Sequence, residues 1–279
     1  MNEQAALWNG TAGRAWVDAQ ELLDGMFAPF EHELVKAVAQ QGARQVLDVG
    51  CGTGSTTLAI ARLAEVHAVG VDVSRPMLEL AQKRAVGTRA SFVEADAQQH
   101  RFAPYDMVVS RFGVMFFADP PRAFANLHRA ARPGATLHML VWRSAADNPF
   151  MTTAERAVGP LLPQLPPRVA NGPGQFAFAD AERVRALLTD SGWSAIDIQP
   201  VDAECTFPER ELVRYLTRLG PLGQVLAQLD PATRTQAIEL ARAAFAPYVQ
   251  GDLVRYTAAC WRLHARRGST QERPVAAST

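Results

Sequence analysis

Cysteine is scarce in this sequence, and its few copies are widely spaced. Among 279 residues there are three cysteines, and no two of them form a CxxC pair. Neither a zinc site nor a disulfide framework is expected from such a pattern. The scarcity suits the reducing cytoplasm, where we expect the protein to be located.

A net charge and long apolar runs are absent as well. The 28 Lys and Arg residues balance the 28 Asp and Glu residues, whereas proteins that bind nucleic acid through its phosphates usually present a basic face. No stretch approaches the roughly 18 apolar residues of a membrane span, and the N-terminus lacks the pattern of a signal peptide. The six histidines do not pair at metal-ligand spacing. We therefore expect no nucleic-acid partner, no membrane span and no metal.

Short apolar runs alternate with helical patterns over the first half of the chain. Strict alternation of this kind predicts a parallel sheet covered by helices on both faces. The expected strands are residues 45–50, 67–72, 90–94, 105–110 and 136–142, and the expected helices are residues 15–23, 29–40, 56–64, 76–85 and 119–131. Ser74 and Asp119 are expected to cap the last two helices.

The alternation ends after Trp142. Residues 144–178 are rich in Pro, Gly and Ala and contain no clear strand. A helix is expected over residues 180–191, a strand over 195–201, two or three helices over 208–247 and a last strand over 252–262. The polar tail from residue 267 onward is expected to be loose.

The loop after the first expected strand has the sequence VLDVGCGTGSTT, residues 46–57. Its glycines at positions 50, 52 and 54 let the backbone turn sharply and approach a ligand closely. The loop opens onto the N-terminus of a helix, which favours an anionic or polar ligand. Ligands of open α/β sheets bind at the carboxyl ends of strands, so we expect a small ligand here.

Three aspartates narrow the choice of ligand. Asp48 lies two residues before the first glycine of the loop, where it would repel a pyrophosphate but attract a cationic amino-acid group. Asp72 ends the second strand, at a spacing from which a carboxylate can accept both ribose hydroxyls. Asp96 follows the third strand, where a polar side chain can accept an adenine amino hydrogen. A bare glycine motif would also fit NAD, but Asp48 and the expected antiparallel last strand disfavour that choice.

With these residues in place, the sequence resembles the class I S-adenosylmethionine-dependent methyltransferases, in the small-molecule branch similar to the ubiquinone/menaquinone C-methyltransferases. The resemblance covers about residues 42–143 and depends on VLDVGCGTG, GVDVSRPML, EADAQ and SRFGVMFFADPPRAFANLHRAARPGATL. It implies an α/β fold with a Rossmann-like seven-stranded sheet, the last strand antiparallel, helices on both faces and a helical lid.

The resemblance also implies a division of the chain. Residues 1–42 would form an N-terminal helical flap, and residues 43–207 the methyltransferase core with a lid insertion at 144–178. A helical lid insertion would follow at 208–250, then the last core strand at 251–266 and a flexible tail at 267–279.

The implied cofactor is S-adenosyl-L-methionine. The glycine loop would surround its methionine part, the ends of the second and third strands its ribose and adenine, and the residues after the fourth strand its sulfonium, with two flap tryptophans closing over it. The expected cofactor-binding residues are Trp8, Trp16, Asp48, Gly50, Cys51, Gly52, Asp72, Val73, Met77, Asp96, Ala97, Ser110, Arg111, Phe112 and Phe116.

Methyl transfer from a sulfonium is an in-line displacement, in which alignment of the two reactants can supply most of the barrier reduction. A general base is needed only for a nucleophile whose proton has a high pKa, so the sequence identifies no catalytic residue. Placement alone suggests Arg111, Trp142, Tyr248 and Tyr256 as contacts to a small-molecule acceptor.

Other functions stay open at this stage. The fold could serve a cofactor-binding protein with a non-methylating or regulatory role, an NAD-dependent dehydrogenase, or a methyltransferase of nucleic acid or protein. The string from Asp119 to Arg122 resembles the Asp-Pro-Pro-Tyr site of DNA amino-methyltransferases, but its arginine and its position favour a helix start. The sequence determines neither the acceptor atom (O, N, S or C) nor the oligomeric state.

Overall fold

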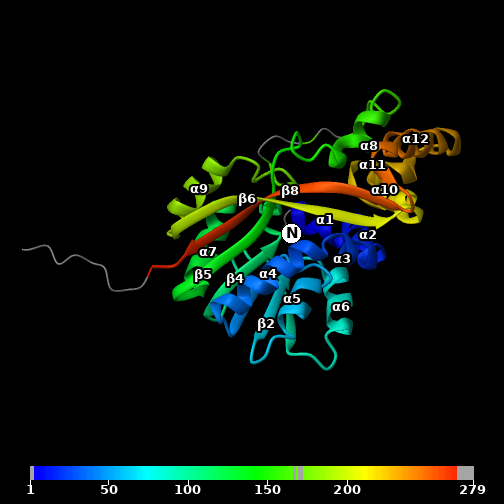
Figure 1. Ribbon diagram of the computed structural model, residues 1–279. Coiled ribbons are helices and arrows are strands. Elements are labelled where there is room, and N and C mark those ends of the chain that lie inside the picture. Colours follow the sequence, from blue (N-terminus) through cyan, green and yellow to red (C-terminus); the bar gives the residue numbers. More distant parts are fainter. Residues whose placement is uncertain (1–2, 166–167, 169–171, 269–279) are drawn as a thin grey trace, which may run out of the picture.

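The computed structural model describes residues 3–165, 168 and 172–268 of the chain, and its centre is one mixed β-sheet (Figure 1). Within these residues the strand order is β3-β2-β1-β4-β5-β8-β6, with a short β7 paired to β8. Strands β1 to β5 are parallel, whereas β8 runs antiparallel to both β5 and β6. The expected Rossmann-like sheet with an antiparallel last strand is thereby confirmed.

Most strands begin within one residue of where they are expected, but β5 begins at Ala131, five residues before its expected start. Their bounds are β1 Gln45–Val49, β2 His67–Asp72, β3 Ala90–Glu94, β4 Tyr105–Arg111, β5 Ala131–Trp142, β6 Ser194–Pro208, β7 Val249–Gln250 and β8 Leu253–Arg266. The central strands β1 and β4 are buried along most of their length, because a parallel sheet is covered on both faces. Strand β6 extends seven residues beyond the expected end and pairs with β8 along this extension.

Helices surround the sheet. Their bounds are α1 Glu3–Asn9, α2 Thr11–Asp18, α3 Gln20–Met26, α4 Ala28–Gln41, α5 Ser55–Ile60, α6 Arg75–Arg84, α7 Pro120–Ala130, α8 Phe150–Val158, α9 Ala181–Asp190, α10 Leu212–Arg218, α11 Gly220–Val225 and α12 Pro231–Ala244. The described part of the chain also contains four short 3₁₀ helices, at Val114–Phe116, Glu209–Glu211, Leu226–Gln228 and Ala246–Tyr248. Asp119 caps α7 as expected, by accepting the Arg122 amide.

The prediction of a single helix over residues 15–23 is wrong. The chain turns at Ala19, whose φ of −97° and ψ of 12° are not helical, and α2 and α3 lie on either side. The turn at this fully buried alanine lets α3 bury Leu22, Leu23 and Met26 in the core. Because helical spacing continues through residue 19, the sequence pattern alone does not reveal the break.

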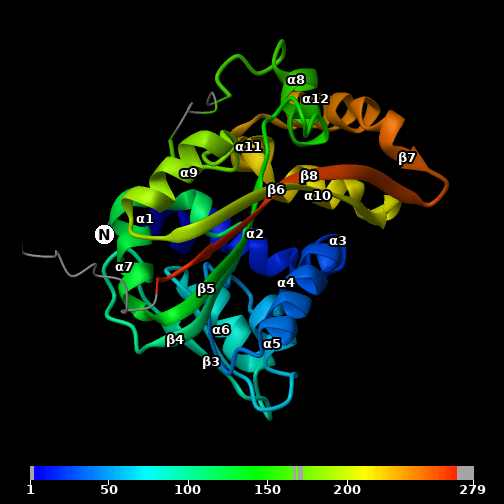
Figure 2. The same ribbon diagram turned by 60° about the vertical axis from the view of Figure 1, so that its left-hand side comes forward.

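Helices α8, α10, α11 and α12 form a layer above the carboxyl ends of the strands, called here the upper helical layer. Helix α12 packs against α8 and α10, and both views show α8, α10, α11 and α12 gathered on the long β6–β8 ribbon (Figures 1 and 2). Helices α1 to α3 lie between this group and α6 in the same views, and α2 contacts α6. The N-terminal helices therefore lie between α6 and the upper helical layer, which itself rests on β6 and β8.

The C-terminal end of the described chain is held in place. Arg267, the first residue of the expected tail, donates to the carbonyls of His128, Arg129 and Ala131, whereas residues 269–279 of that tail lie outside the described residues. None of the helices in the described ranges combines the length and apolar character that crossing a membrane requires.

Two glycines bring the loops after β1 and β4 into direct contact. A Cβ on Gly50 would lie 2.6 Å from the Cα of Gly113, and a Cβ on Gly113 would lie 2.6 Å from the Cα of Gly50. Gly50 also adopts a φ of +69°, which only glycine adopts readily. The backbones of the two loops therefore pack together with no room for a side chain on either residue.

This contact predicts an unequal response to two alanine substitutions. Gly113→Ala should lower the free energy of unfolding by about 1–3 kcal/mol, because the new methyl overlaps backbone atoms. The control Gly25→Ala lies in α3, where a Cβ meets nothing within 4 Å, and should be neutral or stabilising by up to about 1 kcal/mol. Urea denaturation measures both, and equal effects would contradict the contact.

Candidate active site

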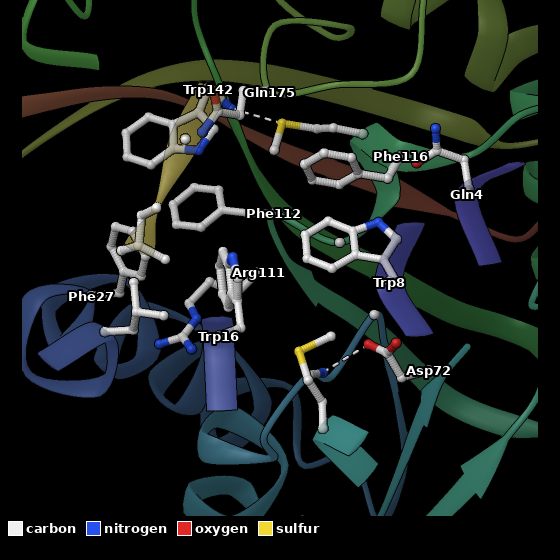
Figure 3. Close-up of a pocket in the computed structure, with 18 of the residues that line it drawn as sticks. Gln4, Trp8, Trp16, Phe27, Asp72, Arg111, Phe112, Phe116, Trp142 and Gln175 are labelled. Atoms are coloured by element: carbon white, nitrogen blue, oxygen red, sulfur yellow. Dashed lines mark hydrogen bonds between the residues drawn. The ribbon is translucent and has the colours of Figure 1, made fainter. Parts of the chain in front are cut away.

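A cavity of about 200 Å³ lies where the carboxyl ends of β1, β2, β4 and β5 face helices α1 to α3 and the upper helical layer. Residues from the N-terminal helices, the glycine loop, the strand ends and the upper layer all contribute to its wall (Figure 3). One end is lined by the glycine loop and by the aspartates at the end of β2 and after β3. The other end is lined mainly by aromatic and aliphatic side chains, together with Glu155, Arg168 and Gln175. The first end is therefore polar, and the second is mainly aromatic with one ion pair, Arg168–Glu155, in its wall.

Asp72 joins the end of β2 to the glycine loop. Its Oδ2 accepts the Gly52 amide at 2.9 Å and its Oδ1 accepts the Ser74 amide at 2.9 Å. Burial raises the pKa of this carboxyl, and the two amide donors partly offset the effect. The carboxylate is thus held rigidly in the cavity wall, where it can accept further hydrogen bonds from a ligand.

Asp48 lies beneath the same loop and keeps one oxygen unused. Its Oδ2 accepts the Thr57 hydroxyl at 2.6 Å, while its Oδ1 is buried and has no partner among the described residues. Burial raises the pKa of this carboxyl from 3.8 to about 6. A buried acceptor without a donor is costly, so its position favours a ligand that brings a donor or a positive charge.

A group of partly buried charges lies next to Asp48. Arg111 faces the carboxylates of Asp24, Glu31 and Asp48, which oppose the lowering of its pKa by burial. Its Nη1 is buried without a partner in the described part of the chain. Arg84 pairs with Asp24 at 2.6 Å. This region therefore offers an unpaired acceptor and an unpaired donor of opposite charge, which matches a zwitterionic ligand.

The N-terminal segment is tied to the loop after β2 by three hydrogen bonds. Asn9 donates from Nδ2 to the Val73 carbonyl at 2.8 Å and accepts the Arg75 amide at 2.9 Å. The Ser74 hydroxyl donates to the Trp8 carbonyl at 2.7 Å, so Ser74 does not cap α6 with its side chain as expected. These bonds hold α1 over the cavity.

Aromatic rings form the apolar walls. Figure 3 shows Phe112 and Trp142 on one side of the cavity and Trp8 and Phe116 on the other. Phe112 and Trp142 are stacked, with centroids 4.4 Å apart, and Trp8 meets Phe116 edge-on at 5.0 Å. Phe112 has a φ of +66°, and a strained non-glycine residue of this kind is typical of functional sites.

The structure brings most of the expected site residues to this cavity or to a smaller one of about 30 Å³ beside the glycine loop. Among the described residues, the walls do not include Ser110, Tyr248 or Tyr256. Ser110 donates to the Val49 carbonyl and accepts the Gly113 amide, so it joins the two loops. Tyr256 stacks on Phe150 in the core, and the Tyr248 hydroxyl lies 3.4 Å from that of Thr153.

Several wall residues were not expected from the sequence. They share no motif and come from α1, the 3₁₀ helix after β4 and the upper helical layer: Gln4, Gly113, Met115, Phe150, Met151, Glu155, Arg168, Gln175, Tyr215 and Phe245. Only Gly113 carries a sequence signal, as a glycine directly after the fourth strand. The described residues contain no group of three or more His, Cys, Asp or Glu suited to a metal ion.

Known proteins resemble this chain both in sequence and in structure. The methyltransferase domain family matches residues 46–134. The demethylmenaquinone methyltransferase of Renibacterium salmoninarum is 26% identical over 205 residues, which cover 70% of this chain and 85% of that protein. The phosphoethanolamine N-methyltransferase 1 of Triticum aestivum is 33% identical over 106 residues, covering 37% and 21%.

Two solved structures share the fold. The YcgJ protein of Bacillus has a TM-score of 0.56 and 15% identity, covering 86% of this chain and 98% of that one. The [4+2]-cyclase SpnF has a TM-score of 0.53 and 20% identity, covering 85% and 80%. At these identities the likeness extends to the fold alone.

The buried Asp48 predicts a pH-dependent stability. Because folding raises its pKa from 3.8 to about 6, ionisation at neutral pH destabilises the folded state by about 3 kcal/mol. Asp48→Asn should therefore raise the free energy of unfolding at pH 7.5, and the gain should shrink as the pH falls through 6 towards 4. Urea denaturation across this range measures it.

Asp106 supplies a control of opposite sign. Burial would raise the pKa of its carboxyl, but hydrogen bonds from Arg132 and from the amides of Gln45 and Arg44 lower it below its ordinary value. Asp106→Asn should therefore be destabilising at pH 7.5, and the loss should shrink in acid. A pH-independent gain in Asp48→Asn would contradict the assigned titration.

Proposed function

We propose that this chain, a class I S-adenosylmethionine-dependent methyltransferase resembling the quinone methyltransferases, transfers the methyl group to an apolar aromatic small molecule in the cavity. The observation that carries the proposal is the division of one cavity into a polar end at the glycine loop and a mainly aromatic end under the upper helices. The polar end would hold the cofactor, and the aromatic end the acceptor.

The residues at the polar end have the chemistry that the cofactor requires. Asp72 offers a carboxylate at the end of β2 for the ribose hydroxyls, and Val73 and Met77 offer apolar surface for the adenine. Asp96 and Ala97 line the cavity after β3, where they would contact the adenine edge. When bound, the cofactor would supply a methyl group on a sulfonium, and attack of the acceptor on that methyl carbon would break its C–S bond and leave S-adenosylhomocysteine.

The buried charges next to the glycine loop would hold the amino-acid part. The unpartnered Oδ1 of Asp48 is suited to its ammonium, and the unpartnered Nη1 of Arg111 to its carboxylate. Each pairing would satisfy a buried polar atom that otherwise costs about 1–3 kcal/mol. The loop backbone at Gly50, Cys51 and Gly52 would lie alongside.

The aromatic end would hold and align the acceptor. Trp8, Phe112, Phe116 and Trp142 enclose this part of the cavity, so an apolar acceptor gains by leaving water there. Alignment of acceptor and methyl is the main catalytic requirement of this displacement. The absence of a nucleic-acid partner and the cytoplasmic location both remain predictions from the sequence.

The proposed role of Arg111 predicts that its substitution weakens the binding of ligands that carry the amino-acid part. Arg111→Met should weaken the binding of S-adenosylhomocysteine at least tenfold, because it removes a buried charge from the carboxylate. Adenosine, which lacks the amino-acid part, should bind the variant as it binds the wild type. Isothermal titration calorimetry measures both ligands, and an equal loss for the two would contradict the assignment.

The acceptor is tested by turnover. With S-adenosylmethionine present, aromatic phenols, quinols and thiols should release S-adenosylhomocysteine faster than aliphatic amines and alcohols of similar size. Trp142→Ala should raise KM for the aromatic acceptors by removing wall surface, with cofactor affinity unchanged. No binding of S-adenosylmethionine at millimolar concentration would overturn the function itself, and turnover of aliphatic acceptors alone would overturn the aromatic preference.

A further inference from the structure

The apolar end of the cavity contains a tyrosine that the methyl-transfer chemistry does not require. Tyr215, on α10, lies in the wall together with Phe150, Met151 and Phe245. Its ring is stacked on Phe207, with centroids 5.2 Å apart and planes at 29°, and it meets Phe245 at 6.0 Å. The ring is thereby fixed from two sides, which fixes the direction of its hydroxyl.

The Tyr215 hydroxyl has no hydrogen-bond partner within the described ranges. Burial raises the pKa of this phenol well above its usual value, so it stays protonated and can donate at neutral pH. A phenol in an apolar wall usually finds a partner. The hydroxyl is therefore available as a donor to a molecule in the cavity.

The charged neighbour at this end of the cavity is already occupied. Arg168 donates from Nε and Nη2 to both carboxylate oxygens of Glu155, at 3.0 Å and 2.5 Å, and also contacts Gln175 and the Met151 carbonyl. With its donors engaged and its charge neutralised, Arg168 has little capacity to bind an anionic ligand. Tyr215 is left as a neutral donor beside this internally paired Arg168 and Glu155.

We propose that the Tyr215 hydroxyl donates a hydrogen bond to an oxygen substituent on the acceptor's aromatic ring, so that the enzyme selects phenol-type or quinol-type molecules over unoxygenated rings of the same size. This inference depends on the proposed function. Tyr215 would bind the acceptor and set its orientation, and it takes no part in moving the methyl group.

The test compares two probes that differ by one hydroxyl. 1-Naphthol and naphthalene are titrated into protein saturated with S-adenosylhomocysteine, and binding is followed by quenching of tryptophan fluorescence, since Trp8, Trp16 and Trp142 line the cavity. Tyr215→Phe should weaken 1-naphthol binding about tenfold, the effect of one hydrogen bond in a dry site. Naphthalene affinity should not change.

Tyr248→Phe is the matched control. It also removes one phenolic hydroxyl, from a residue whose partner is Thr153, and it should leave both probes unaffected. With a phenolic acceptor, Tyr215→Phe should raise KM more than it lowers kcat, whereas a merely structural role would alter naphthalene binding as well. Urea denaturation checks that each variant is folded.

The outcomes separate the two claims. If wild-type protein fails to bind S-adenosylhomocysteine, the proposed function fails and the inference with it. If it binds, but Tyr215→Phe leaves the ratio of 1-naphthol to naphthalene affinity unchanged, the inference alone is overturned. Failure of the wild type to prefer 1-naphthol over naphthalene also overturns it.

Discussion

The whole site depends on a backbone contact between two glycines. Gly50 and Gly113 follow β1 and β4, the two strands between which the order of the sheet reverses. Open α/β sheets bind ligands at such a point because the loops diverge there and leave a crevice. In this chain the glycines let the two loops touch at the bottom of that crevice. Ser110, which bonds to both loops, fixes their spacing and so the base of the cavity.

The polar end of the cavity is built at a cost to stability. Asp48 and Arg111 each keep a buried polar atom without a partner in the described part of the chain, and Phe112 has a strained backbone worth about 1–3 kcal/mol. A fold optimised for stability alone would avoid all three. A zwitterionic ligand would satisfy both orphaned atoms, so the cost is recovered on binding, which is the usual relation between stability and function.

The two ends of the cavity share their walls. Trp8 belongs to α1, which Asn9 and Ser74 tie to the loop after β2, and its ring also meets Phe116 beside the aromatic end. Movement of α1 would therefore open the ribose region and the acceptor region together. One covering segment can in this way exclude water from both reactants, which favours the alignment that a displacement reaction needs.

The sequence by itself determined the parallel core and the glycine loop, because apolar runs and glycines act locally on the backbone. Asp48 and Asp72 were singled out for the same reason, since each lies at a fixed place relative to a strand end, whereas Phe112 came from the family resemblance. Only the tertiary structure decided the opposite wall. Asn9 meets a loop 64 residues away, and Tyr215 reaches the cavity because the long β6–β8 ribbon supports α10. Such contacts depend on how helices pack, which no local pattern encodes, and they include Tyr215, which we propose to contact the acceptor.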